Sequence, residues 1–537
     1  MTKIEAHPEM LWSGWGDPAE AVTLPPELLG LLKQALGVPG PRAAVAGIEA
    51  IALADPALSG SALERLAAVV GAANIRTEAA TRALHTRGKS TPDLLKIRAG
   101  DAADAPDAVV LPATHDEVLE LLHACSQERI AVVPFGGGTS VVGGLQPRRD
   151  GFDGVIALDL GRMTQLLDLD AESRTATLQP GLRGPEAEAL LGEHGFTIGH
   201  HPQSFLFATI GGFAAARSSG QASAGYGRFD ERVVGLTVAT PTGTIELGRA
   251  PKSAAGPDLR QLFLGSEGAF GVITSVTVEV KPAPAVKVYE GWRFESFAAG
   301  TTALRKLIQD GPVPTVLRLS DEAETALNLA RPSEVGAAGE DAPTGACLGI
   351  VGFEGTEQDV EARRTGATAV LREIGAQLDA PAGESWEHGR YRGPYLRDAL
   401  LDEGALVETL ETTTFWSGIP ALYAAVGEAL RQSLTAQGTP PVVMTHISHV
   451  YPSGASLYFT VACAQTDDPL SQWQRAKAAA SDAIIATGGS ITHHHGIGVD
   501  HRPWYERQIG PLGVAALQAV KAKLDPAGIM NPGVLIP

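Results

Sequence analysis

A run of three histidines near the C-terminus carries side chains that could do chemistry: His493, His494 and His495, followed by Gly496. Histidine titrates near neutral pH, so these imidazoles are candidate acid/base or anion-binding groups. If the backbone over 491–495 is extended, His493 and His495 share one face and His494 points the other way. A metal held by His493 and His495 is an alternative, but no motif supplies a third ligand, so we predict no metal. A purely structural run remains open.

A glycine-rich segment, 134–144, is the strongest single motif, and it directly follows the apolar stretch 130–133. Glycines let backbone N–H groups approach an anion, and the hydroxyls of Thr139 and Ser140 add donors. The spacing fits neither a GxxxxGKS/T loop nor GxGxxG at the start of a helix, which disfavours ATP and the usual dinucleotide folds. The motif therefore predicts a pyrophosphate site, with a flexible turn between strands as the alternative.

Two later segments, 209–220 and 265–274, again combine glycines, small residues and hydroxyls. Small side chains permit close backbone contact with a long, flat ligand. These segments therefore support the same kind of site as the glycine-rich one.

The elements that must position these motifs are short strands and helices in alternation. Apolar runs at 108–111, 130–133 and 155–158 alternate with a helical pattern at 116–127, which predicts an α+β domain with partly parallel strands. The alternating run 272–280 reads as a strand that ends at Lys281-Pro282, because proline cannot donate to a ladder.

The length of 537 residues exceeds the usual size of one domain and predicts two or three domains. By the texture of the sequence, we expect four regions along the chain. These are a helical N-terminal region (1–98), the α+β domain of the glycine motifs (99–284), a second α+β substrate or cap domain (285–480) and a C-terminal segment completing the site (481–537). Within the second domain, the Gly, Ala, Pro and Glu content of residues 331–344 predicts a surface loop.

Composition restricts the partners. The net charge of -19 disfavours nucleic acid and anionic membranes, which bind basic surfaces. The three cysteines are scattered and form no disulfide or metal motif, so a reducing compartment fits best. Without a secretory signal, a spanning segment or a peroxisomal C-terminal tripeptide, we predict a cytoplasmic protein, with membrane contact at most peripheral. A homodimer is expected because such symmetry is common among soluble enzymes.

The three glycine-rich motifs, in order P-F-G-G-G-T-S, T-I-G-G…R-S-S-G and G-S-E-G-A-F-G-V-I-T, resemble the PCMH-type FAD-binding domain of the vanillyl-alcohol oxidase/para-cresol methylhydroxylase superfamily. The closing D-P-A-G-I-M-N-P-G is similar to the C-terminal signature of many members. The resemblance implies FAD, with its pyrophosphate on 134–140, its flavin along 202–208 and 216–219, and its adenosine side at 267–273. The residues so implied are Pro134, Phe135, Gly136, Gly137, Gly138, Thr139, Ser140, Pro202, Gln203, Ser204, Ala208, Thr209, Gly211, Gly212, Ala216, Arg217, Ser218, Ser219, Glu267, Gly268, Ala269, Phe270, Gly271, Val272 and Ile273.

Covalent flavin in this superfamily often uses a His or Cys near these loops. Cys125 precedes the glycine-rich segment by too much, and His200 and His201 remain open candidates. We therefore predict non-covalent FAD.

The three-histidine run, where hydroxy-acid oxidising members often have Glu-His-Gly, resembles the alkyldihydroxyacetonephosphate synthase family. So do W-S-G-W-G at 12–16, P-K-S-A-A-G-P-D at 251–258 and segments around Arg318, Arg397 and Tyr458. The resemblance implies replacement of the acyl group of acyl-dihydroxyacetone phosphate by a fatty alcohol, with no net redox change. It implies Tyr458 and the three histidines as catalytic groups, and Arg318 and Arg397 as binding groups for a phosphate or carboxylate.

Two other functions stay open: an FAD-dependent oxidase or dehydrogenase of a 2-hydroxy acid or alcohol, and a non-catalytic flavin-binding protein. The substrate is expected to be a small or lipid-like molecule. By residue type alone, each arginine could instead be a surface ion-pair partner, and Tyr458 a half-buried strand aromatic.

Overall fold

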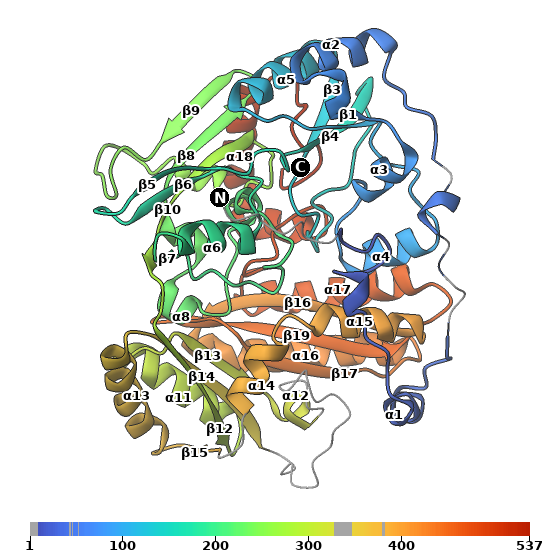
Figure 1. The fold of residues 1–537 in the computed structure, drawn as a ribbon. Coiled ribbons are helices and arrows are strands. Elements are labelled where there is room, and N and C mark those ends of the chain that lie inside the picture. Colours follow the sequence, from blue (N-terminus) through green and yellow to red (C-terminus); the bar gives the residue numbers. More distant parts are fainter. Residues whose placement is uncertain are drawn as a thin grey trace.

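The structure is a computed structural model that describes residues 9–41, 45, 47–51, 53–326, 346–378 and 382–536. The loop predicted at 331–344 lies outside the described residues. Figure 1 shows two stacked halves, the upper one built from the blue-to-green part of the chain and the lower one from a large sheet in olive and orange. The N-terminal segment runs down beside both halves.

The first sheet of the upper half is mainly parallel. Its order is β1 (Ile75–Arg76), β2 (Ala108–Val110), β4 (Gly154–Asp159) and β3 (Ile130–Phe135), with β2, β4 and β3 parallel and β1 antiparallel. The strands are almost wholly buried, as expected when both faces of a parallel sheet are covered. Helices α2 (Gly60–Val70) and α5 (His115–Gln127) share their core. The boundary at residue 98 stays a prediction, although α2 and β1 already pack with this sheet.

The second sheet of the upper half is antiparallel, in the order β5 (Leu166–Asp170), β6 (Thr175–Leu178), β10 (Val272–Glu279), β8 (Val233–Thr240) and β9 (Gly243–Leu247). Helices α6 (Gly184–Gly192) and α7 (Ile210–Ala216) contribute to its core. Strand β10 stops before Lys281, as predicted. The sequence did not show that Lys281–Pro282 form a further short strand, β11, which pairs with β7 (Phe196–Thr197).

The lower half holds an eight-stranded sheet whose two faces have different neighbours. The order is β15 (Ala376–Gln377), β12 (Val286–Phe294), β14 (Cys347–Gly355), β13 (Val316–Ser320), β17 (Val442–Ile447), β19 (Gly454–Ala464) and β16 (Ala405–Phe415), with β18 (Val450–Tyr451) paired to β19. Leu457, Phe459 and Val461 of β19 pack in the core with α11 (Phe297–Asp310), α13 (Glu357–Leu371), α16 (Ile419–Ala436) and α17 (Pro469–Ala486). The alternate residues Tyr458 and Thr460 therefore face away from these helices, toward the upper half.

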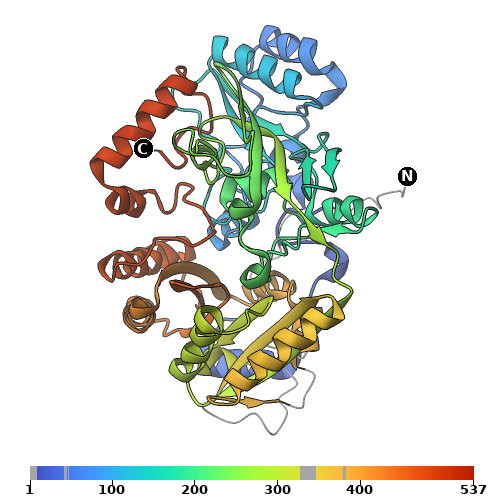
Figure 2. The ribbon, with the colours of Figure 1, turned by 90° about the vertical axis from the view of Figure 1, so that its left-hand side faces the viewer.

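Both ends of the chain reinforce the two halves. Helix α1 (Pro26–Leu36) brings Leu36 against Val407 and Ala464 of the large sheet. In Figure 2 the red C-terminal helix α18 (Arg502–Leu524) lies along the upper half, and Gly510, with a φ of 72°, interrupts it before Pro511. After α18, Met530 forms a single parallel β-bridge with Val132 of β3.

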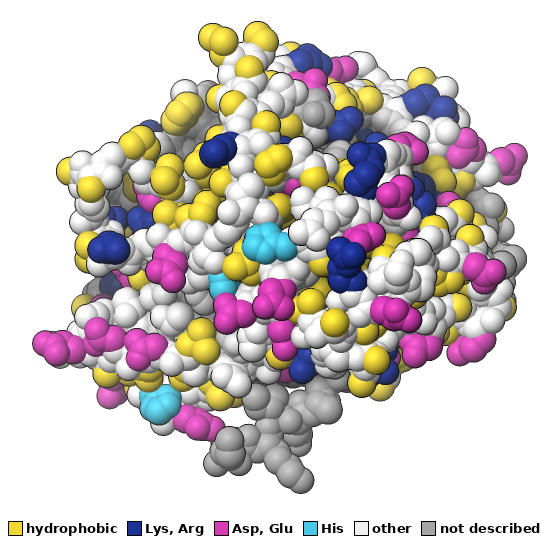
Figure 3. Space-filling model, turned by 90° about the horizontal axis from the view of Figure 1, so that it is seen from above, with side chains coloured by type: hydrophobic (Ala, Val, Ile, Leu, Met, Phe, Trp, Pro, Cys, Tyr) yellow, Lys and Arg dark blue, Asp and Glu magenta, His cyan; other side chains and the backbone are white. Residues whose placement is uncertain are grey.

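The shorter helices connect these layers. They are α3 (Ala79–Leu84), α4 (Thr91–Arg98), α8 (Ser223–Tyr226), α9 (Phe229–Arg232), α10 (Arg260–Phe263), α12 (Glu322–Ala326), α14 (Ala382–Gly389) and α15 (Gly393–Asp402). No helix within the described ranges combines the length and apolarity needed to cross a bilayer. On the face seen in Figure 3, Lys and Arg side chains are interspersed with Asp and Glu.

Candidate active site

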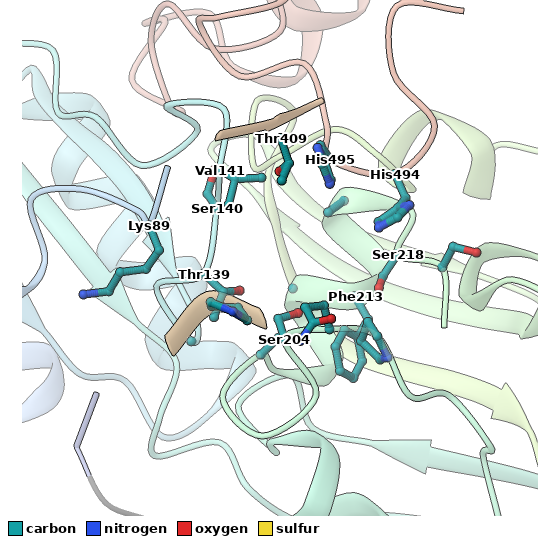
Figure 4. A pocket seen from close by; sticks show the side chains of 18 of the residues that line it. Lys89, Thr139, Ser140, Val141, Ser204, Phe213, Ser218, Thr409, His494 and His495 are labelled. Atoms are coloured by element: carbon teal, nitrogen blue, oxygen red, sulfur yellow. The ribbon is translucent and has the colours of Figure 1, made fainter. Parts of the chain in front are cut away.

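A cavity of about 500 Å³ is lined by residues of both halves. The glycine-rich segment and the segments 202–219 and 266–273 line it from above, and β13, β16, β17 and β19 from below. Figure 4 shows Thr139 and Ser140 across the cavity from His494, with Ser204 and Phe213 below them. The cavity therefore brings together the glycine motifs and the histidine run, which lie more than 200 residues apart in the sequence.

The glycine-rich segment forms a cradle that side chains would fill. A Cβ at Gly136 would lie 2.4 Å from Thr209 Oγ1, and one at Gly137 only 2.0 Å from the carbonyl oxygen of Phe207. Among the residues that the structure describes, no acceptor is found for the backbone N–H groups of 137–142. Unpaired N–H groups in a glycine cradle fit the pyrophosphate of a dinucleotide. All seven predicted residues, 134–140, line the cavity.

The second segment lines the cavity at the start of α7, where Thr209 Oγ1 accepts a bond of 3.3 Å from Gly212 N. The predicted residues that line the cavity here are Pro202, Gln203, Ser204, Ala208, Thr209, Gly211, Gly212, Ala216, Ser218 and Ser219. Arg217 does not, contrary to prediction. With a φ of 51°, its side chain turns away and its Nε donates to Leu264 O at 2.8 Å.

In the third segment, Glu267 fixes the turn after the histidine run. Its Oε2 accepts from Ile497 N at 2.8 Å and from Gly498 N at 2.9 Å. Burial raises the pKa of Glu267 to about 7, although these bonds oppose the shift. Glu267, Gly268, Gly271, Val272 and Ile273 line the cavity. Ala269 and Phe270, also predicted to bind the cofactor, instead pack in the apolar core, where each is 1% exposed.

A buried carboxylate that the sequence did not reveal organises the histidines. Glu411 of β16 has its Oε2 2.6 Å from His494 Nδ1 and 3.9 Å from His495 Nε2, while its Oε1 lies 3.6 Å from His493 Nδ1. The backbone at 493–495 bends rather than extends, so the expected pairing of His493 with His495 on one face is wrong. His494 and His495 line the cavity, whereas His493 is turned into the protein, where Tyr451 Oη lies 2.7 Å from its Nε2.

Burial and the contacts between Glu411 and the histidines set the pKa values of this cluster. Burial pushes the pKa of Glu411 upward, but His494, His493 and His449 around it hold that pKa well below its ordinary value. Burial lowers the pKa of His493 far below its usual range and those of His449 and His495 to about 3. These three imidazoles are therefore neutral at physiological pH beside an ionised carboxylate.

The same residues raise the question of a metal. Ligand atoms of Glu411, His449, His493 and His494 all lie within 4.8 Å of one another. Two ligands of one tetrahedral Zn²⁺, with bonds of about 2.0–2.1 Å, lie about 3.3 Å apart. The 2.6 Å contact between Glu411 and His494 is shorter, so the carboxylate and the imidazole touch each other directly, as the two members of an ion pair do.

Tyr458 lies beside this pair on β19, where strand register places it directly opposite Glu411 of β16 and His446 of β17. Its ring stacks on His446 at 4.7 Å and meets His495 edge-on at 5.7 Å. Burial raises the pKa of Tyr458, so its phenol holds its proton at neutral pH. A neutral phenol at the cavity wall is suited to donate a proton.

The two predicted arginines line the cavity but are already paired. Arg318 donates to Glu324 Oε1 at 2.6 Å and contacts His446 Nδ1 at 3.0 Å. Arg397 donates through Nε and Nη2 to Asp398 Oδ1 at 3.1 and 3.0 Å, and through Nη1 to the carbonyl of Lys89 at 2.6 Å. Their charges are therefore partly compensated within the protein.

Sequence reasoning missed Glu411, His446, His449 and Lys89. A signal was present for Glu411, since it is one of two carboxylates, with Glu408, in the otherwise apolar and threonine-rich run 405–415, and a buried carboxylate needs a partner. Lys89 gave no such signal. Its Nζ donates to the carbonyls of Leu11 and Trp12, at 2.7 and 3.1 Å, at the cavity wall.

This fold and site define an FAD-binding flavoprotein. Residues 106–248 match the family model for the FAD binding domain, and residues 283–535 match that for the C-terminal domain of FAD linked oxidases. FAD is the cofactor. Crystal structures of p-cresol methylhydroxylase share the fold, with a TM-score of 0.66 at 17% identity over 89% of this chain and 96% of that one.

More specifically, the chain belongs to the alkyldihydroxyacetonephosphate synthase family. It is 33% identical to the alkyldihydroxyacetonephosphate synthase of Dictyostelium discoideum, over 99% of this chain and 94% of that protein. It is 34% identical to that of Trypanosoma brucei brucei, over 99% and 93%. A solved alkyldihydroxyacetonephosphate synthase superposes with a TM-score of 0.83 at 30% identity, covering 98% of each chain.

Proposed function

We propose that this protein catalyses an FAD-dependent exchange on acyl-dihydroxyacetone phosphate. A long-chain alcohol replaces the acyloxy group, giving alkyl-dihydroxyacetone phosphate, a fatty acid anion and a proton. The observation that carries the proposal is the wall of Tyr458, His494 and His495 facing the glycine cradle, in a chain similar to the synthases over its full length. When bound, FAD supplies an electrophilic ring next to which the substrate carbon reacts.

The residues of the chain supply binding and proton transfer. The glycine cradle, with Thr139 and Ser140, holds the FAD pyrophosphate. Tyr458 Oη moves a proton at the substrate carbon that loses the carboxylate, and the Glu411–His494 pair holds a second proton at the same wall. Apolar side chains of the cavity, Val407, Met444 and Ala462 among them, accommodate the alkyl and acyl chains.

We further propose that FAD is held without a covalent bond. Cys125 is fully buried in the core of the first sheet, with its thiol pKa raised to about 12 by burial. Neither His200 nor His201 lines the cavity. Acid precipitation of the yellow protein should therefore release all flavin into the supernatant, and flavin left on the pellet would contradict this.

The experiment that tests the exchange is product analysis by mass spectrometry. The holoenzyme is incubated with acyl-dihydroxyacetone phosphate and a long-chain alcohol in the absence of any electron acceptor. We expect alkyl-dihydroxyacetone phosphate and free fatty acid in equal amounts. No ether product from folded, FAD-loaded protein would reject the proposal.

A second candidate is an FAD-linked oxidoreductase acting on a hydroxy acid or alcohol. It is favoured by similarity to the FAD-linked oxidoreductase YgcU of Escherichia coli, at 29% identity over 88% of this chain, and to glycolate oxidase subunit GlcD of Bacillus subtilis, at 27% over 80%. Anaerobic mixing with 2-hydroxy acids separates the two functions. An oxidoreductase loses its yellow flavin colour with its substrate, whereas the exchange enzyme keeps it.

For the setting of this activity, we propose a cytoplasmic homodimer that meets membranes at most peripherally. The acidic composition and the mixed charges on the face in Figure 3 support weak membrane contact. Light scattering of the purified protein tests the dimer, and cell fractionation tests the location.

A further inference from the structure

Arg390, which follows α14, is a buried cation. It is 9% exposed and lines the cavity. Within the described part of the chain no Asp or Glu oxygen lies within 4.0 Å of its guanidinium, and its Nε and Nη1 have no hydrogen-bond acceptor. Leaving charged donors buried and unpaired is unfavourable, and native proteins rarely do so without a ligand or water.

Aromatic rings fix the guanidinium. Its central carbon lies 5.6 Å from the ring centroid of Trp386 and 5.0 Å from that of Tyr391. Such packing on ring faces stabilises the cation and leaves the N–H edge free for a planar or tetrahedral anion. Trp386 also lines the cavity, so the edge of this cluster borders the same space as the substrate site.

Two amide side chains lie beside Arg390. Gln221 Nε2 donates to the carbonyl of Arg390 at 3.2 Å and to Gln203 Oε1 at 3.4 Å, and the amide nitrogen of Gln203 has no partner. The hydroxyl of Tyr391 is buried close to the charge of Arg390. Burial, with the charge of Arg390, lowers the pKa of His201 to about 3, so that neighbour is neutral at physiological pH. Within the described part of the chain, this corner leaves three donor nitrogens without a partner, Nε and Nη1 of Arg390 and Nε2 of Gln203, and one amide acceptor, Oε1 of Gln221.

The other cations that line the cavity are less suited to hold a buried anion. Arg392 is exposed to solvent. Arg318 and Arg397 are engaged by Glu324 and Asp398, and Lys89 by two carbonyls. We propose that Arg390, with the amide of Gln203, forms a subsite for the phosphate of a phosphomonoester substrate. This inference rests on the proposed function for the identity of the ester, but the phosphate chemistry follows from the subsite alone.

Ligand binding tests the subsite without turnover. Dihydroxyacetone phosphate is titrated into the holoenzyme by isothermal calorimetry, with unphosphorylated dihydroxyacetone as the neutral comparison. Arg390→Met keeps a linear side chain over the rings but removes the charge and the donors. Because hydrogen bonds to charged groups are the strong ones, we expect the dissociation constant for the phosphate ester to rise about 10- to 100-fold. Arg390→Lys should recover part of the lost affinity for the phosphate ester.

Two controls decide the interpretation. Arg392→Met removes an exposed arginine of the same cavity and should leave binding unchanged; an equal loss would show that overall charge, not a subsite, attracts the ligand. The FAD content of Arg390→Met should equal that of the parent, and a flavin-poor variant would assign Arg390 to the cofactor and overturn the subsite. Unchanged phosphate affinity in folded, yellow Arg390→Met would also overturn it.

The two proposals fail separately. A wild-type protein that forms the ether product while Arg390→Met binds dihydroxyacetone phosphate normally would reject the subsite only. A wild-type protein that forms no ether product, but binds the phosphate ester through Arg390, would reject the exchange and keep the subsite.

Discussion

Glu411 Oε2 lies 2.6 Å from His494 Nδ1, joining a fully buried carboxylate on the large sheet to an imidazole at the cavity wall. Strand β16 holds Glu411 by pairing with β19 on one side, and the bend at 493–495 brings the imidazole to it. Glu411 touches no part of the cavity itself, so it acts by positioning the histidine and fixing its tautomer.

Replacing that carboxylate should therefore impair turnover more than folding. Glu411→Gln keeps the shape but removes the charge, and a wrongly oriented or wrong tautomer of His494 costs about 10²–10⁴ in rate in comparable carboxylate–histidine pairs. FAD content should stay at the parent level. Glu428→Gln, an exposed carboxylate on α16, serves as the control and should be silent. Full activity of Glu411→Gln would show that the pair is only structural.

Tyr458→Phe isolates proton transfer. The variant keeps the ring that stacks on His446 and removes only the hydroxyl. Loss of a general acid typically costs about 10²–10⁴ in rate, so steady-state kinetics should show turnover collapsing while the melting temperature and flavin absorbance stay the same. Near-full activity in folded, yellow protein would make Tyr458 an ordinary strand aromatic and leave the histidines as the acid/base candidates.

Gly137→Ala tests the cradle. A Cβ there would lie 2.0 Å from a backbone carbonyl, that of Phe207, which has no free rotation to yield. We expect protein purified with little or no FAD, measured as flavin absorbance per protein. Gly192→Ala in α6, where a Cβ meets nothing within 4 Å, is the matched control and should retain FAD. A fully loaded Gly137→Ala would contradict the close approach of these two segments.

Acid should destabilise the protein partly through His201. Burial and the charge of Arg390 lower its pKa to about 3, whereas an unfolded imidazole titrates near about 6.5. Between these values the unfolded state binds one more proton, so stability is present above about pH 6.5 and is lost toward pH 3, by at most about 1.4 kcal/mol per pH unit. Melting temperatures at pH 7 and pH 5 should differ less for His201→Gln than for the parent. Equal differences would show that His201 titrates normally.

Much of the fold could be predicted from local pattern. The apolar run 130–133 forms β3, and the helical pattern 116–127 forms α5. Such patterns can be predicted because the spacing of apolar residues indicates which residues of an element are buried. The order of strands could not be predicted, since it depends on pairing between distant segments such as β13 and β17. The row Glu411–Tyr458–His446 exists only through that order.

The candidate site, too, could be predicted from the sequence only in part. The glycine cradle was visible because close backbone approach demands glycine itself. Arg397 looked like a free anion binder, although its neighbour in the sequence, Asp398, and the distant carbonyl of Lys89 both accept from it. Asp398 accepts from Arg397 and also from Trp15 N, at 2.5 Å. The N-terminal W-S-G-W-G and the Y-L-R-D segment thus form one contact, which no local pattern could show.

The most direct test of the exchange follows the oxygen of the alcohol. Holoenzyme is incubated with palmitoyl-dihydroxyacetone phosphate and an ¹⁸O-labelled long-chain alcohol, and the lipids are analysed by mass spectrometry. The proposed reaction breaks the bond between the dihydroxyacetone carbon and the acyloxy oxygen, so the label should appear wholly in alkyl-dihydroxyacetone phosphate, with unlabelled palmitate released. Label in a wax ester, with free dihydroxyacetone phosphate, would show attack at the acyl carbonyl and contradict the account.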